Sequence, residues 1–117
     1  MRVWNIWKGT KNWHRNVANE EKPEHEVVSF VGEELGSWTV ENDASQYVVT
    51  FYVYRTDEDR IIIQKLKKAL NPGWDHHSLV WEYSDIEAAG KAAWRVLFNL
   101  DSDHYLIKEW RERWLNS

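Results

Sequence analysis

Apolar, β-branched and aromatic residues dominate the middle of this 117-residue chain in short runs bounded by polar turns, and this pattern predicts β-strands. Residues 46–55 consist almost entirely of β-branched and aromatic side chains, which suit a pleated strand with both faces at least partly covered. A polar turn, Thr56-Asp57-Glu58-Asp59, separates this run from residues 60–66, where Ile61-Ile62-Ile63 resumes the apolar pattern. The two runs therefore predict an antiparallel hairpin.

Three shorter runs predict further strands. Residues 26–31 and 37–41 lie on either side of Gly32 and Gly36, so we expect them to form a preceding hairpin or an edge of the same sheet. Residues 79–83 follow the turn sequence Asn71-Pro72-Gly73 and add another strand.

The apolar period changes in the last third of the chain. Ser84-Asp85-Ile86-Glu87 has the capping-box pattern, in which the serine oxygen accepts from an early backbone N–H of a helix. Asp101 or Asp103 can cap a second helix. The apolar stripe of the first helix comprises Ile86, Gly90, Ala93, Trp94 and Leu97, and that of the second comprises Leu106, Ile107, Trp110 and Trp114.

Strands followed by helices indicate a segregated α+β fold: a mainly antiparallel sheet of four or five strands with two C-terminal helices packed on one face. The length fits one domain spanning residues 1–117. Its expected parts are an N-terminal arm or edge strand (1–15), a loop (16–25), the sheet (26–83) and a helical segment (84–117).

Composition and charge limit the cellular compartment and the kinds of site that we expect. With no cysteine the chain forms neither disulfides nor thiolate metal sites, and its start lacks the apolar core of a signal peptide, so we expect a cytoplasmic protein. No apolar run approaches the roughly 20 residues of a membrane helix. The arm has four basic side chains and no acid, whereas residues 16–46 carry eight acids and the single base Lys22, so the two segments can pair.

The sequence Phe30-Val31-Gly32-Glu33-Glu34-Leu35-Gly36-Ser37-Trp38, followed by Phe51-Tyr52-Val53-Tyr54-Arg55-Thr56, resembles the central segment of the small bacterial proteins called the EXLDI family. The chain lacks that family's terminal Glu-x-Leu-Asp-Ile tag and ends in Trp114-Leu115-Asn116-Ser117. The resemblance implies no particular activity. It implies structural roles for Gly32, Gly36, Trp38 and Arg55 in a strand–turn–strand unit.

The N-terminal arm is the first candidate binding site. Three of the nine tryptophans of the chain lie in it among basic residues: the candidate set is Trp4, Trp7, Lys8, Lys11 and Trp13. Aromatic rings stack on unpaired bases and basic groups neutralise phosphates, so the arm suits single-stranded nucleic acid. Alternatively, the arm is a strand whose tryptophans pack into the sheet, because tryptophan is highly buried on average.

The last helix is the second candidate. Trp110 and Trp114 lie four residues apart beside Arg111. If this face is exposed, tryptophan and arginine make it a protein-binding surface, and if it packs on the sheet it is core. A domain of this size has difficulty burying nine indole rings, and exposed aromatic patches mark partner sites.

The sequence shows no catalytic, metal or cofactor site. His76 and His77 follow a turn and His104 lies near Asp101 and Asp103, but neighbouring side chains of an extended segment point to opposite faces and do not chelate one ion. No serine has a nucleophile-elbow glycine pattern, and no glycine-rich phosphate loop is present.

We therefore expect a non-catalytic protein that binds a macromolecule, such as a bacterial or phage-type regulator, inhibitor or adaptor that docks on a protein partner. One alternative is single-stranded nucleic-acid binding through the arm, and another is a hydrolase of unknown substrate. The oligomeric state and the identity of the partner do not follow from the sequence. The expected binding residues are Trp4, Trp7, Lys8, Lys11, Trp13, Trp110, Arg111 and Trp114.

Overall fold

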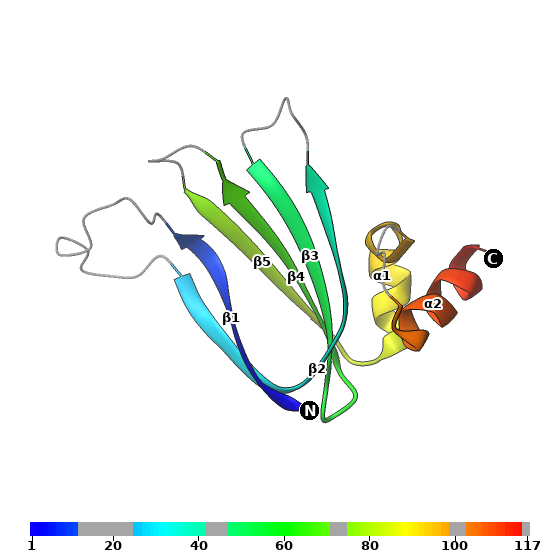
Figure 1. Ribbon diagram of the computed structural model, residues 1–117. Helices are drawn as coiled ribbons and strands as arrows, with labels where there is room; N and C mark the ends of the chain where they lie inside the picture. Colours follow the sequence, from blue (N-terminus) through cyan, green and yellow to red (C-terminus); the bar gives the residue numbers. More distant parts are fainter. Residues whose placement is uncertain (12–24, 42–46, 71–74, 99–102, 116–117) are drawn as a thin grey trace.

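The computed structural model describes residues 1–11, 25–41, 47–70, 75–98 and 103–115 (Figure 1). Five strands precede two helices along the chain, as the sequence predicts. They are β1 (Arg2–Lys11), β2 (His25–Glu41), β3 (Tyr47–Thr56), β4 (Ile61–Ala69), β5 (His76–Tyr83), α1 (Ile86–Phe98) and α2 (Tyr105–Leu115).

The sheet is antiparallel throughout and closes on itself. Each strand pairs with the next in sequence, and β1 pairs with β5, so the strand order β1-β2-β3-β4-β5 forms a closed barrel. The expected α+β architecture, with a mainly antiparallel sheet and two C-terminal helices, is confirmed. The closure is a feature the sequence did not predict, because it depends on pairing between the first and the last strand.

The predicted central hairpin is confirmed as β3 and β4, with Tyr54 opposite Ile62. Its polar turn is held by Thr56, whose Oγ1 accepts hydrogen bonds from the backbone N–H groups of Glu58 at 3.3 Å and Arg60 at 3.1 Å. Asp59 adopts a positive φ of 60° in this turn. Short polar side chains tolerate that left-handed conformation better than bulky ones do, which explains why a polar turn serves here.

The prediction of two separate runs at 26–31 and 37–41 is wrong, because β2 is one strand of 17 residues. Its first half pairs with β1 and its second half with β3, so that Gly32 lies opposite both Arg2 and Thr56. A Cβ atom at position 32 would collide with the carbonyl group of Arg55. Gly32 is therefore needed because the strands pack closely at this position, and it does not form a turn. Further along β2, a register shift between Glu34 and Gly36 marks a β-bulge.

The two faces of the sheet support two clusters of apolar side chains. Outside the barrel, the helices pack on β2, β3 and β4 through Ala89, Ile107 and Trp110, which join Leu35, Val53, Ile61 and Ile63. Inside the barrel, Ile6, Tyr54 and Ile62 pack with Trp4, Val28, Phe30, Tyr52 and Val80. Successive strand residues alternate between the two clusters, which is why residues 46–55 are apolar on both sides.

The caps of both helices differ from the sequence prediction. Asp85, rather than Ser84, caps α1, because its Oδ1 accepts a hydrogen bond of 2.8 Å from the N–H of Ala88. At α2 the cap is His104, whose Nδ1 accepts from the N–H of Leu106 at 3.2 Å. Of the two acids predicted for that cap, Asp103 instead makes an ion pair with Lys108 and residue 101 lies outside the described ranges.

Residues 2–11 of the predicted arm form β1, in agreement with the alternative that the arm is a strand of the sheet, although β1 pairs with both β2 and β5 and is not an edge strand along its whole length. Most of the predicted loop at 16–25 lies outside the described ranges. The expected pairing of basic and acidic segments occurs at Lys8 and Glu26, whose charged groups lie 3.2 Å apart. Neither described helix has the length and apolarity needed to span a membrane.

Candidate protein-binding site at the junction of β1 and β5

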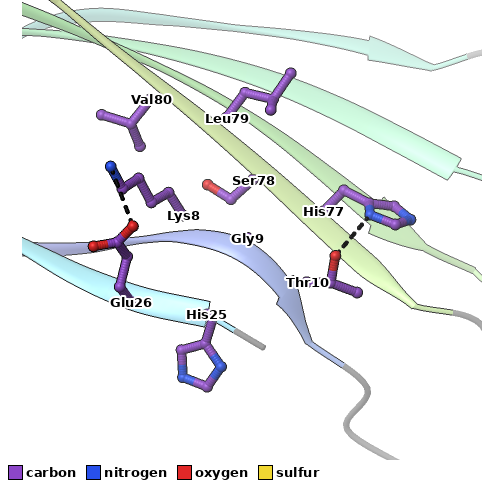
Figure 2. Close-up of a pocket in the computed structure, with 9 residues that line it drawn as sticks. All are labelled: Lys8, Gly9, Thr10, His25, Glu26, His77, Ser78, Leu79 and Val80. Atoms are coloured by element: carbon purple, nitrogen blue, oxygen red, sulfur yellow. Dashed lines mark hydrogen bonds and ion pairs between the residues drawn. The ribbon is translucent and has the colours of Figure 1, made fainter. Parts of the chain in front are cut away.

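The barrel closes through a short seam between β1 and β5. Within the described residues three pairs join the two strands: Gly9 with Ser78, Thr10 with His77 and Lys11 with His76. Beyond Gly9 and Ser78 the strands diverge, and Figure 2 shows the side chains of Lys8 and Val80 in the space between them. We call this divergence the β1–β5 fork.

A buried polar network fixes the point at which the strands separate. Ser78 Oγ donates a hydrogen bond of 2.6 Å to the main-chain carbonyl oxygen of Trp7. Gln64 Nε2 donates to Ser78 Oγ at 2.9 Å and to the same carbonyl at 3.3 Å. These side chains satisfy a backbone acceptor of β1, and Gly9 beside it has a φ of 116° that favours glycine. The backbone of β1 therefore turns away from β5 at Gly9.

A cavity of about 590 Å³ lies at the fork. The ion pair of Lys8 and Glu26 lies along it, and Thr10 Oγ1 and His77 Nδ1 lie 3.3 Å apart in the seam (Figure 2). The cavity thus has both polar and apolar walls. It is lined by Lys8, Gly9, Thr10, His25, Glu26, His77, Ser78, Leu79 and Val80.

The fork leaves one edge of β5 open. Among the described strands, residues Leu79–Tyr83 pair only with β4. On the outer face of this edge the side chains of Leu79 and Trp81 are 53% and 40% exposed. Two large apolar side chains on an open strand edge form a surface suited to a macromolecular partner.

The outer face of β1 and β2 is also apolar in part. Val3 lies opposite Val31, and both are exposed, as is Val27. Between them Ser29 Oγ donates to Asn5 Oδ1 at 2.7 Å. We define the outer apolar surface as Leu79 and Trp81, because Val3, Val27 and Val31 lie on the strands that diverge from β5.

A second surface of the barrel combines aromatic rings with lysines. On the outer faces of β2 and β3, the rings of Trp38 and Phe51 stack with their centroids 5.5 Å apart. The ammonium group of Lys65 lies 5.9 Å from the Phe51 centroid, and that of Lys67 lies 4.2 Å from the Tyr47 centroid. These contacts are within the range of cation–π interactions. We call these five residues the aromatic–lysine surface.

Trp4 and Trp7, the first two predicted binding residues, are partly buried. Trp4 lies in the barrel interior, where its Nε1 donates to the carbonyl oxygen of Gly32 at 3.0 Å and its ring lies 5.0 Å from that of Tyr54. Trp7 packs edge-on against His25 at 6.2 Å. Trp4 therefore has a structural role, in agreement with the alternative that the arm is a strand whose tryptophans pack into the sheet.

The basic residues of the arm are placed only in part. Lys8 lies at the fork in its ion pair with Glu26. Lys11 closes β1 opposite His76, and its side chain lies outside the described part of the structure, as does all of Trp13.

The prediction that Trp110 belongs to an exposed surface of the last helix is wrong. This side chain is 2% exposed and belongs to the core beneath the helices, so it does not form an exposed binding surface. Arg111 beside it is half-buried. The side chain of Trp114 is outside the described residues.

The neighbouring histidines of β5 point to different surroundings, as alternation predicts. His76 is buried and its Nδ1 accepts a hydrogen bond of 2.9 Å from the N–H of Ala69, whereas His77 faces Thr10. Within the described ranges no group of three or more metal-ligating side chains comes together. Ser78 hydrogen-bonds to Trp7 and Gln64.

Sequence reasoning missed Leu79 and Trp81 as candidate site residues. Both lie in a strand that the sequence predicts, and their alternation with Val80 places them on one face. The sequence does not show that this face is exposed. Its exposure depends on where β1 separates from β5 and on which strands the helices cover.

Comparisons with protein-family models, curated proteins and solved structures find no match for this chain. The resemblance of its central segment to the EXLDI family stays a prediction. Of the residues it involves, Gly32 allows close strand packing and Arg55 forms an ion pair of 2.9 Å with Glu33.

Proposed function

We propose that this chain is a non-catalytic binding protein that docks on a protein partner through its outer apolar surface. The observation that supports the proposal is the exposure of Leu79 and Trp81 beside an open strand edge, on a barrel that buries part of its outer apolar face under helices. Apolar and aromatic side chains of this kind form the centres of protein interfaces.

The chemistry of the fork favours recognition over catalysis. Its serine, Ser78, donates its hydroxyl hydrogen to a backbone carbonyl, and its one close pair of opposite charges, Lys8 and Glu26, is mutually neutralised. A partner bound here would cover Trp81 and the cavity mouth. The mechanism of such a regulator, inhibitor or adaptor is steric occupation of the partner surface.

The test compares affinity purification with the wild-type chain and with a Leu79→Lys/Trp81→Lys double variant, after nuclease treatment. We expect one dominant protein to be retained by the wild type and lost with the double variant. Both substituted side chains are exposed, so far-ultraviolet circular dichroism should be unchanged. Retention of the same protein by a folded double variant would refute the assignment of this surface.

A second candidate function is the binding of single-stranded nucleic acid, favoured by the aromatic–lysine surface. Stacking on rings such as Trp38 and Phe51 is worth roughly 1–3 kcal/mol per base, and lysines neutralise phosphates. The residues that support this candidate lie on β2, β3 and β4, not on the arm from which the sequence predicted it.

Salt dependence separates the two candidates. Binding of a labelled oligothymidine should weaken steeply between low and physiological salt if phosphate contacts dominate, and Lys65→Gln with Lys67→Gln should reduce the slope by about two contacts. A protein interface centred on Leu79 and Trp81 should change little over the same range. Absence of oligothymidine binding at low salt would exclude this candidate.

A further inference from the structure

We propose that the partner is engaged by β-strand addition: an extended segment of the partner protein pairs with the open edge of β5 at Leu79–Tyr83. This inference rests on the proposed protein-binding function and names the kind of segment bound. Strand addition uses backbone hydrogen bonds for affinity and alternate side-chain positions for specificity.

The open edge supplies the backbone groups. In an antiparallel sheet each strand directs alternate N–H and C=O groups to its two sides. β5 is paired with β4 along Ile61–Lys67, but among the described strands β1 covers its other side only as far as Ser78. The backbone groups of Leu79–Tyr83 that face away from β4 therefore match those of an incoming strand.

The segment Leu79–Tyr83 itself carries few of the devices that usually prevent such pairing. Natural edge strands are protected by lysine, proline, bulges or inward-pointing charges. The segment Leu79-Val80-Trp81-Glu82-Tyr83 contains neither lysine nor proline, and its register with β4 is regular. Its one charge, Glu82, forms an ion pair of 2.9 Å with Arg60, which leaves it neutralised.

The fork also defines the side chains the segment should carry. Leu79 and Trp81 project outward, so alternate residues of the added strand lie beside them and should be apolar. The intervening residues face Ser78, Val80 and the ion pair of Lys8 in the cavity, which favours small polar side chains. The fitting segment is an extended stretch in which valine or leucine alternates with threonine or serine.

The test uses the full chain and synthetic peptides. The probe is an acetylated, amidated peptide of roughly eight residues alternating valine and threonine, the length of a typical strand. The control peptide has the same sequence except for one proline at its centre, which removes a backbone donor and breaks strand pairing. Amide hydrogen exchange of the isotope-labelled chain is measured by NMR with each peptide.

We expect the alternating peptide to slow exchange of alternate amides within Leu79–Tyr83 by about tenfold or more at saturation, and the proline peptide to have no effect. Leu79→Lys should weaken binding by about tenfold, because a lysine on an edge opposes strand pairing. Leu70→Lys is the matched control, since Leu70 is similarly exposed at 58% but lies outside β5. It should bind as the wild type does.

Four results would overturn strand addition. They are no binding of the alternating peptide, binding that leaves the β5 amides unprotected, protection in the free chain that rises with protein concentration, and protection in the free chain at all concentrations. The third would identify a second copy of the chain as the occupant, and the fourth would show that the edge is already covered. The first two results leave the proposed function standing, whereas the fourth would also remove the open edge on which it rests. The proposed function is refuted separately if the partner binds equally well to the folded Leu79→Lys/Trp81→Lys variant.

Discussion

Ser78 Oγ donates a hydrogen bond of 2.6 Å to the main-chain carbonyl oxygen of Trp7, and this contact joins strands that are 71 residues apart in sequence. It lies where the seam between β1 and β5 ends. Ser78 is 1% exposed, and its hydroxyl makes a shorter contact with this carbonyl than Gln64 does at 3.3 Å. The buried serine therefore helps to fix the position of the fork.

Ser78→Ala should destabilise the protein by about 1–3 kcal/mol, because it removes a buried hydroxyl that hydrogen-bonds to both the Trp7 carbonyl and Gln64. Urea unfolding gives the change in free energy. Amide exchange at Gly9 and Lys11 should also accelerate, since the seam next to the serine loosens. Ser37→Ala is the control: Ser37 also lies in a strand, but it is exposed, and its substitution should change stability by less than about 0.5 kcal/mol. Equal stability of the two variants would refute a structural role for the network.

Local pattern was sufficient for some elements of the fold. The hairpin of β3 and β4 follows from alternation and a polar turn, because its contacts are close in sequence. The cap of α1 lies one residue later than the sequence predicts. Ser84 and Asp85 are both good capping residues, and the path of the chain after β5 determines which of them caps the helix.

Other features depend on distant contacts. Glycine marks turns as well as close strand packing, and only the position of Arg55 shows that Gly32 serves the second purpose. The burial of Trp110 and the exposure of Trp81 likewise follow from where the helices lie, although both residues are tryptophans on amphipathic elements. The candidate site could not be predicted because strand closure, not residue type, creates it.

Gly32→Ala should destabilise the protein by about 3 kcal/mol or more. A methyl group at this position meets the backbone of Arg55 and Thr56, which moves only with the strand, so the cost should reach or exceed that of ordinary overpacking. Denaturant unfolding measures the loss. Val31→Ala, a change at the exposed neighbouring position, should cost much less. A Gly32→Ala variant as stable as Val31→Ala would show that β2 and β3 are not in close contact there.

Asp85→Ala should destabilise the protein by about 0.5–2 kcal/mol, because it removes the acceptor for the N–H of Ala88 at the start of α1. Ser84→Ala should have almost no effect, since Ser84 is exposed and precedes the cap. The two variants therefore distinguish the cap seen in the structure, Asp85, from the cap that the sequence predicts, Ser84. Thermal unfolding followed by circular dichroism makes the comparison, and a larger loss for Ser84→Ala would reverse the assignment.

Tyr54 should titrate at higher pH than the ordinary pKa of a tyrosine. Burial in the barrel interior raises the pKa of its phenol above the ordinary value near 10, and the nearby carboxylate of Glu34 adds to the effect. The neutral form is favoured in the folded state, so this group contributes stability below pH 10 that is lost as the pH rises towards the folded pKa. Ultraviolet absorbance of tyrosinate should show a late phase that is absent in Tyr54→Phe. A titration in which all five tyrosines ionise together while the protein remains folded would contradict the buried position of Tyr54.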